Sequence, residues 1–124
     1  MNARALLVCA ALAWGGLALP ATAQKAPAPG ARALPEMAIA ELPPEARQAV
    51  ALIRKGGPYL YARDGAVFVN REGALPRQKR GYYREYTVKT PGERTRGARR
   101  IVAGSGGEIY YTDDHYSHFR RVRE

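Results

Sequence analysis

The chain has 124 residues, which is room for one domain, and it carries 20 Lys and Arg against 11 Asp and Glu. Its single cysteine, Cys9, excludes a disulfide framework within the chain. The formal net charge of +9 attracts polyanions, so nucleic acid and an anionic membrane surface are the two partners that the composition favours.

The first 23 residues follow the order of a secretory signal peptide. Residues 1–4 give a positive start, residues 5–19 form an apolar run, and residues 21–23 make a small-x-small cleavage site. The run is shorter than the roughly 20 residues of a membrane-spanning helix; an uncleaved N-terminal anchor is the alternative. Cleavage after Ala23 leaves 101 residues, no cysteine and a net charge of +8. We therefore expect a secreted, extracellular protein with no membrane segment after signal cleavage.

Residues 24–40 are rich in alanine and proline, which predicts a flexible tether ahead of a folded domain over residues 41–124. A helix is predicted over residues 44–55, where apolar residues recur at helical spacing. These apolar residues are Ala46, Ala49, Val50 and Ile53. Pro44 suits the first helical position, and Gly56 suits the end of the helix.

Five strand-like runs follow the helix, each rich in β-branched or aromatic residues and separated by glycine or proline. They cover residues 66–69, 82–89, 99–103, 109–112 and 118–122. One helix followed by consecutive short strands predicts an α+β fold, with an N-terminal helix packed on a twisted antiparallel sheet of about five strands. The face of the sheet away from the helix is then free to carry polar side chains.

The alternation of side chains along the strands predicts which residues share a face. Tyr86, Val88 and Ile101 would form a core face, while Glu85 and Arg100 would emerge together on the opposite, polar face. A shift of one residue in strand register would reverse this assignment.

Three kinds of side chain on the predicted polar face and its loops could act on a phosphodiester. Glu85 is centred in a strand, His115 lies in a segment dense with Tyr and Asp, and residues 94–100 hold four arginines. A carboxylate, an imidazole and guanidinium groups supply a base, an acid and charge stabilisation without a metal. Each feature alone has a plainer interpretation: a solvated glutamate, a structural histidine and a general phosphate patch.

A metal site is a second interpretation of the histidine-rich segment. Asp113, Asp114, His115 and His118 could act as ligands, but no other ligand cluster in the sequence accompanies them. We therefore expect neither a metal nor a cofactor.

Five stretches together resemble the microbial guanyl-preferring ribonucleases, the barnase-like family, and look closest to its secreted ribonuclease Sa branch. The resemblance extends from residue 42 to residue 122, which is nearly the whole predicted domain. The matching stretches are LPPEA at 42–46, DGAVFVNRE at 64–72, GYYREYTV at 81–88, TPGERTRGARRIV at 90–102 and YYTDDHY at 110–116.

The resemblance implies a role for each reactive side chain. Glu85 matches the general base, and His115 matches the general acid. Arg96 and Arg100 match the two phosphate-binding arginines, and Tyr116 matches a substrate-contacting tyrosine. We also expect the acidic residues that precede His115, Asp113 and Asp114, to hold its ring protonated near neutral pH.

The resemblance also implies a guanine-binding loop, formed by Phe68, Val69, Asn70, Arg71 and Glu72. The Glu72 carboxylate can accept the N1–H and N2–H₂ donors of guanine, although this residue could instead simply form the turn before Gly73. Tyr82 or Tyr116 could stack on the base. The sequence departs from the ribonuclease Sa branch at Val69, where that branch has an amide, at Arg84, where it has histidine, and in lacking its cysteine pair.

The implied activity is cleavage of single-stranded RNA on the 3′ side of guanosine, through a 2′,3′-cyclic phosphate that is then hydrolysed to the 3′-phosphate. One alternative is a basic RNA-binding module without catalysis, which would not need both Glu85 and His115. Another is the same nuclease used as an exported toxin. We expect a monomer, with a small acidic barstar-like inhibitor as a further partner if the host needs protection before export.

Overall fold

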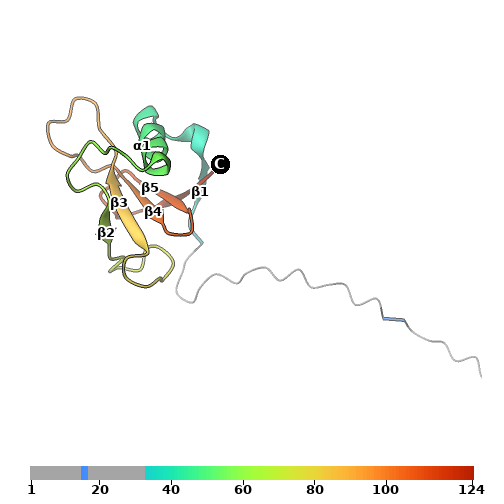
Figure 1. Ribbon diagram of the computed structural model, residues 1–124. Coiled ribbons are helices and arrows are strands. Elements are labelled where there is room, and N and C mark those ends of the chain that lie inside the picture. The colour runs from blue at the N-terminus through green and yellow to red at the C-terminus, as the bar shows by residue number, and fades with distance from the viewer. Residues whose placement is uncertain (1–14, 17–32) are drawn as a thin grey trace, which may run out of the picture.

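The computed structural model describes residues 15–16 and 33–124. Over the second range the chain forms one α-helix that lies across a twisted sheet (Figure 1), preceded by a short 3-10 helix, η1 (Ile39–Glu41). The predicted signal peptide, apart from residues 15–16, and residues 24–32 of the predicted tether lie outside the described residues. Within the described ranges, no helix is both long and apolar enough to span a membrane.

The helix α1 (Pro44–Lys55) has the boundaries that the sequence predicts. Pro44 lies in the first turn, where a backbone N–H would have no hydrogen-bond partner within the helix, so its absence in proline costs nothing. Gly56 ends it at a φ of 86°, a left-handed conformation that glycine adopts without steric cost, and donates its N–H to Leu52 and Ile53 carbonyls. The buried side chains of α1 are Ala46, Ala49 and Val50, three of the four residues of the predicted apolar face. The fourth, Ile53, is partly buried against the same cluster.

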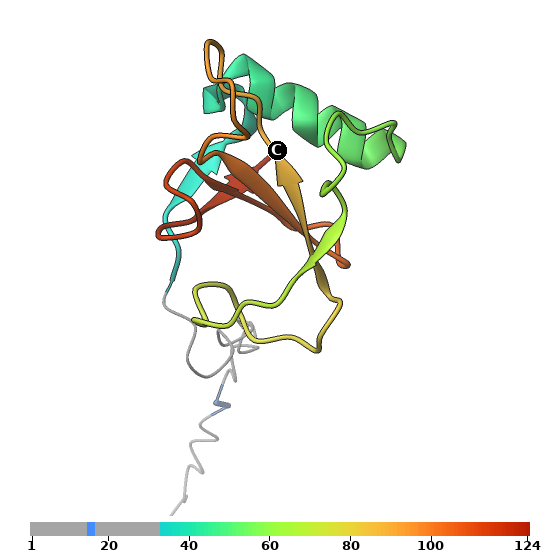
Figure 2. The same cartoon turned by 90° about the vertical axis from the view of Figure 1, so that its left-hand side faces the viewer.

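The sheet has six strands in the order β1-β6-β5-β4-β3-β2. These strands are β1 (Glu36–Ala38), β2 (Ala66–Phe68), β3 (Tyr83–Thr87), β4 (Arg100–Gly104), β5 (Ile109–Thr112) and β6 (Arg120–Arg123). The predicted α+β fold, with its N-terminal helix and the five strands that follow it, is confirmed. Figure 2 shows the helix against the sheet, with the long connection between β2 and β3 at the far end.

The sixth strand corrects two expectations. Residues 36–38, which were assigned to the tether, form β1 and pair in parallel with β6, so the sheet is mixed rather than purely antiparallel. The Arg121 N–H also donates to the Pro35 carbonyl. Met37 is buried in the core next to its register partner Val122, and this burial orders the segment.

The predicted register is confirmed. Tyr86 faces Ile101 across β3 and β4, while Glu85 pairs with Val102 and Thr87 with Arg100. Ile101 and Val88 are buried in the cluster beneath α1, and Tyr86 packs against that cluster. The other members of the cluster include Leu42, Val50, Ile109 and Tyr111.

The face away from the helix carries polar side chains, as expected, but it also buries apolar ones. A second buried cluster lies there, formed by Leu75, Tyr83, Val102, Tyr110 and Phe119. The connection between β2 and β3 folds back over this face and buries Leu75, which is only 1% exposed. Asn70 holds the fold of this connection, because its side-chain amide exchanges two hydrogen bonds with the backbone of Leu75.

Candidate active site

Glu85 lies at the centre of β3 on the face away from the helix, and it is 7% exposed. Its Oε2 accepts a hydrogen bond of 2.6 Å from the Tyr116 hydroxyl. Its Oε1 lies 3.4 Å from Nη2 of Arg96 and 3.7 Å from Nε of Arg63. Two guanidinium groups therefore balance the charge of one buried carboxylate, which would otherwise be costly to remove from water.

Arg96 comes from the loop between β3 and β4 and is held by a neighbour of Glu85. Its Nε and Nη2 both donate to the Thr87 hydroxyl, at 2.9 and 2.7 Å. Thr87 and Glu85 point to the same side of β3 because they are two residues apart. Thr87 has no predicted role, although the alternation that places it beside Glu85 on β3 is a signal that could have identified it.

Arg100 in β4 is 2% exposed and lies on the same face as Glu85. Its Nη1 donates to the carbonyls of Gly97 and Arg99, and its Cζ lies 5.9 Å from the centre of the Tyr116 ring. Its Nε is buried without a hydrogen-bond partner among the described residues. A buried, unpaired N–H of a cation destabilises a fold, but it suits a phosphate that arrives with a substrate.

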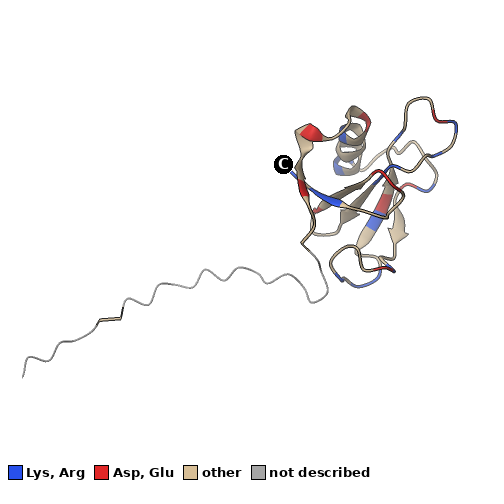
Figure 3. Ribbon diagram, turned by 180° about the vertical axis from the view of Figure 1, so that it is seen from behind, with Lys and Arg blue, Asp and Glu red and all other residues tan. Residues whose placement is uncertain are grey.

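Figure 3 shows basic segments spread over the strands and loops, with acidic segments between them.

His115 and Tyr116 lie on the turn between β5 and β6, at φ values of 54° and 72°. Two consecutive non-glycine residues in the left-handed region are strained, and such strain persists only where surrounding contacts fix it. The His115 N–H donates to the Ala98 carbonyl, which ties the turn to the loop that carries Arg96. The His115 side chain stays exposed beside the Tyr116 ring.

Of the two acidic residues before His115, Asp114 makes its hydrogen bonds with Thr112 and His118. The Asp114 carboxylate accepts hydrogen bonds from the Thr112 hydroxyl at 2.8 Å and from the His118 backbone N–H at 2.9 Å, and it meets the His118 ring at 2.6 Å. Burial alone would raise the pKa of Asp114, but these hydrogen bonds outweigh it and lower the pKa to about 2. The chain reverses direction at His115 and Tyr116, which brings His118 back to Asp114. The Asp114 carboxylate therefore stabilises the turn by binding His118.

Tyr116 connects the carboxylate to the neighbouring cleft. Burial and the hydrogen bond to Glu85 raise the pKa of Tyr116 to about 12, so the phenol keeps its proton and remains a donor. Its ring stacks on Phe68, with ring centres 5.1 Å apart and an angle of 29° between the planes.

A cleft with a volume of about 310 Å³ lies beside Tyr116. Its walls are Phe68, Asn70, Arg71, Glu72, Ala74, His115, Tyr116 and Ser117. The structure thus brings four residues of the predicted guanine-binding loop together with the predicted general acid. Asn70 adopts a φ of 56° and shapes the loop through its bonds to Leu75.

Two predicted substrate contacts lie elsewhere. Val69 is 55% exposed and does not line the cleft. The Tyr82 hydroxyl is 2.9 Å from both carboxylate oxygens of Glu108, and its ring packs against the edge of Tyr83, outside the cleft. Of the two tyrosines proposed to stack on the base, only Tyr116 lines the cleft.

The metal-site interpretation gains no support from the described residues, because none of their His, Cys, Asp and Glu side chains form a group of three or more that could hold an ion.

Comparison with known proteins identifies the family. A family model described as ribonuclease matches residues 25–123. Guanyl-specific ribonuclease St of Saccharopolyspora erythraea is 60% identical over 85 residues, covering 68% of this chain and 84% of that protein. Guanyl-specific ribonuclease Sa of Kitasatospora aureofaciens is 55% identical over 85 residues, covering 68% of this chain and 88% of that protein.

Solved structures agree with these relatives. Ribonuclease Sa2 in complexes with mononucleotides matches with a TM-score of 0.74 and 48% identity, over 75% of this chain and 97% of that one. Ribonuclease Sa2 with guanosine-2′-cyclophosphate matches with a TM-score of 0.71 and 49% identity, over 73% and 97%. The chain belongs to the ribonuclease family, within its branch of guanyl-specific ribonucleases of the Sa type.

Proposed function

We propose that the chain cleaves single-stranded RNA on the 3′ side of guanosine with Glu85 as general base and His115 as general acid. The observation that carries the proposal is the meeting of a buried carboxylate, guanidinium groups and a base-sized cleft on one face of the sheet. The names of the relatives, guanyl-specific ribonucleases St and Sa, support the substrate class.

In the first step, Glu85 takes the proton of the ribose 2′-hydroxyl and O2′ attacks the phosphorus. The bond from phosphorus to O5′ of the next nucleotide breaks, and His115 gives a proton to that oxygen. The product is a 2′,3′-cyclic phosphate. In the second step the roles reverse: His115 takes a proton from water and the water oxygen attacks phosphorus. The bond from phosphorus to O2′ breaks, and Glu85 returns a proton to O2′ to leave a 3′-phosphate.

Arg96, Arg100 and Tyr116 stabilise the phosphoryl group as its negative charge grows. Guanidinium groups offer donors at the spacing of two phosphoryl oxygens, and a buried site makes each such bond stronger than in water. The Arg100 Nε, which lacks a partner among the described residues, is an N–H for which a phosphoryl oxygen would supply an acceptor.

Guanine binds in the cleft beside Tyr116. The Glu72 carboxylate accepts the N1–H and N2–H₂ donors of the base, whereas adenine would present an acceptor at N1. Phe68 and Tyr116 offer aromatic faces for stacking. Because the Asn70 side chain is committed to Leu75, it contributes by shaping the loop rather than by direct readout.

We also propose that the chain is exported, with removal of residues 1–23, and acts as a monomer. The net charge of +8 that remains would favour RNA and would equally favour a small acidic inhibitor whose carboxylates cover Arg96 and the cleft. A co-expressed acidic protein of this kind would bind competitively with RNA.

The test is cleavage of guanylyl-cytidine and adenylyl-cytidine by the wild-type chain and by Glu85→Gln, with chelator present and with product masses determined. Guanine-selective formation of a cyclic phosphate that collapses in the variant supports the proposal. A folded wild-type protein that cleaves neither dinucleotide but still binds RNA would replace it with the RNA-binding interpretation.

A further inference from the structure

Arg63, in the connection between α1 and β2, is a second arginine close to the Glu85 carboxylate, besides Arg96. Its Nε lies 3.7 Å from Oε1 of Glu85, the oxygen that Arg96 also approaches. The Arg63 side chain is 70% exposed, whereas that of Glu85 is 10% exposed. Within the described residues its guanidinium donates no hydrogen bond, so its donors are free to meet a ligand.

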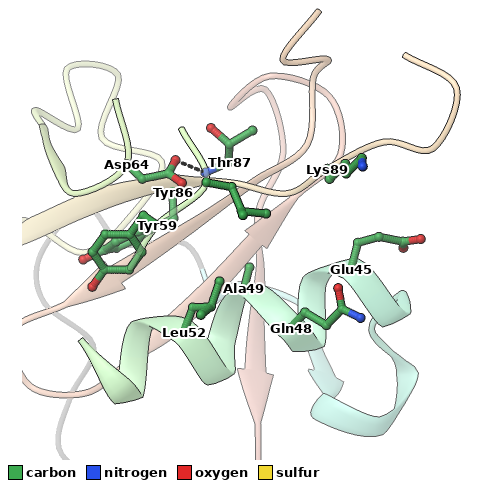
Figure 4. Close-up of a pocket in the computed structure, with 10 residues that line it drawn as sticks. Glu45, Gln48, Ala49, Leu52, Tyr59, Asp64, Tyr86, Thr87 and Lys89 are labelled. Carbon is green, nitrogen blue, oxygen red and sulfur yellow. Dashed lines mark hydrogen bonds between the residues drawn. The ribbon is translucent and has the colours of Figure 1, made fainter. Parts of the chain in front are cut away.

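The backbone that carries Arg63 is fixed although the side chain is not. Asp64 accepts a hydrogen bond of 2.8 Å from the Thr87 N–H, and Gly65 donates one of 2.8 Å to the Glu85 carbonyl. Figure 4, which looks into the crevice between α1 and β3, shows Asp64 reaching Thr87. The connection is therefore anchored to β3 at Glu85 and Thr87, while the Arg63 side chain itself is 70% exposed.

The other two arginines of the site, Arg96 and Arg100, have part of their donors committed. Arg96 gives its Nε and one Nη2 bond to Thr87, and Arg100 gives Nη1 to two carbonyls. The Arg63 side chain is largely exposed and its Nε, at 3.7 Å from Oε1 of Glu85, is beyond hydrogen-bond distance, so this contact adds less to folding than the closer contact of Arg96.

We propose that Arg63 is a further catalytic residue, which leaves Glu85 when RNA binds and donates to the phosphoryl oxygens in the transition state. This inference rests on the proposed function. The 2′-oxygen must lie within hydrogen-bond reach of Glu85, and the phosphorus that it attacks must lie about 3–3.5 Å from it. A guanidinium that already contacts Glu85 Oε1 is therefore within reach of the same phosphoryl group.

The change in charge during the reaction also favours the move of Arg63 from the Glu85 carboxylate to the phosphoryl group. As O2′ loses its proton, Glu85 becomes neutral and the phosphoryl group gains negative charge. The attraction that holds Arg63 at Glu85 falls while the attraction to the phosphoryl oxygens rises, so the interaction is strongest in the transition state.

The test compares the full chain with Arg63→Gln, Arg63→Lys and a control, Arg47→Gln, which removes the same charge from the helix side of the sheet. The substrate is guanylyl-cytidine, which has no phosphate besides the scissile one. We expect Arg63→Gln to lower kcat about 10-fold with little change in KM. This loss is smaller than the roughly 10²–10³-fold loss of kcat on removing a preorganised donor, because Arg63 is exposed. Arg63→Lys should recover part of the loss, and Arg47→Gln should match the wild type.

The pH dependence separates a direct role from an indirect one. If Arg63 donates to phosphate, Arg63→Gln lowers kcat/KM by a similar factor across the pH range. A displaced acidic limb with an unchanged maximum would mean that Arg63 acts only through Glu85, and it would overturn the inference. Unchanged kcat in Arg63→Gln, with an active wild type, would also overturn it and leave the proposed function standing. An inactive wild type would remove the proposed function itself.

Discussion

The two faces of the sheet bury different kinds of side chain. Beneath α1, the buried cluster is formed by apolar residues and Tyr111. On the opposite face lie the four buried polar or charged side chains of the described residues: Glu85, Thr87, Arg100 and Thr112. Register places them side by side, since Thr87 pairs with Arg100 and Arg100 with Thr112. The face beneath α1 therefore contributes apolar burial alone, whereas the opposite face combines an apolar cluster with buried charges that are costly to fold and useful in a reaction.

The largest expected effect comes from the carboxylate on the polar face. Glu85→Gln should lower kcat on guanylyl-cytidine by about 10²–10⁴-fold, because the amide cannot accept the 2′-hydroxyl proton. The matched control is Glu45→Gln, since Glu45 pairs with Arg99 on the helix side at 3.5 Å. Steady-state rates and circular dichroism spectra of both variants make the comparison, and an equal loss in the two would refute the division between the faces.

Arg100 should affect activity and stability in different ways. Arg100→Met should lower kcat by about 10²–10³-fold, because a buried donor to the phosphoryl group is lost. The free energy of unfolding should stay level or rise by about 1 kcal/mol, since a buried cation with an unpaired Nε is removed. Urea unfolding measures this, and a loss of about 2–5 kcal/mol, as for a truncated core side chain, would contradict it.

The helix side should show the reverse behaviour. Ile101 is fully buried beneath α1, next along the chain to Arg100 but on the other face. Ile101→Val should lower the free energy of unfolding by about 0.5–1.5 kcal/mol. Its kcat at temperatures well below the unfolding midpoint should remain that of the wild type. A large loss of kcat in this variant would show that the two faces are coupled.

The smallest effect is expected at the turn that carries His115. Asp114 has a folded-state pKa of about 2, below its ordinary value of 3.8, so its contribution to stability is present above the ordinary value. That contribution is lost as the pH falls through the range from the ordinary value down to the folded-state one. Asp114→Asn should therefore be less stable than the wild type at neutral pH, and the difference should shrink as the pH falls through this window. Thermal unfolding across that range measures it, and a pH-independent difference would argue against the charged turn.

Much of the site could be predicted because strand alternation determines which residues share a face. Strand alternation, with Tyr86 and Ile101 placed on the core side, predicts one face for Glu85 and Arg100, and the register agrees. The strand at residues 36–38 could not be predicted, since three residues are too few to show alternation. Its partner, β6, also lies at the other end of the chain.

Side-chain contacts made across turns could not be predicted from the spacing of residues in the sequence. Asp114 is adjacent to His115, yet two left-handed residues turn the chain so that the carboxylate meets His118. Tyr82 and Tyr83 are neighbours, but only Tyr83 is buried in the second cluster, while Tyr82 reaches Glu108. Arg63 lies in an irregular connection, and its approach to Glu85 depends on bonds that no periodicity predicts.

The most direct test of the account is the pH dependence of kcat/KM on guanylyl-cytidine for the wild type, Glu85→Gln and His115→Gln. The wild type should give a bell-shaped profile, because it needs one group deprotonated and another protonated. Glu85→Gln should retain residual activity without the acidic limb, and His115→Gln without the alkaline limb. Profiles that keep both limbs in both variants would show that another pair of groups performs the proton transfers, which would contradict the central claim.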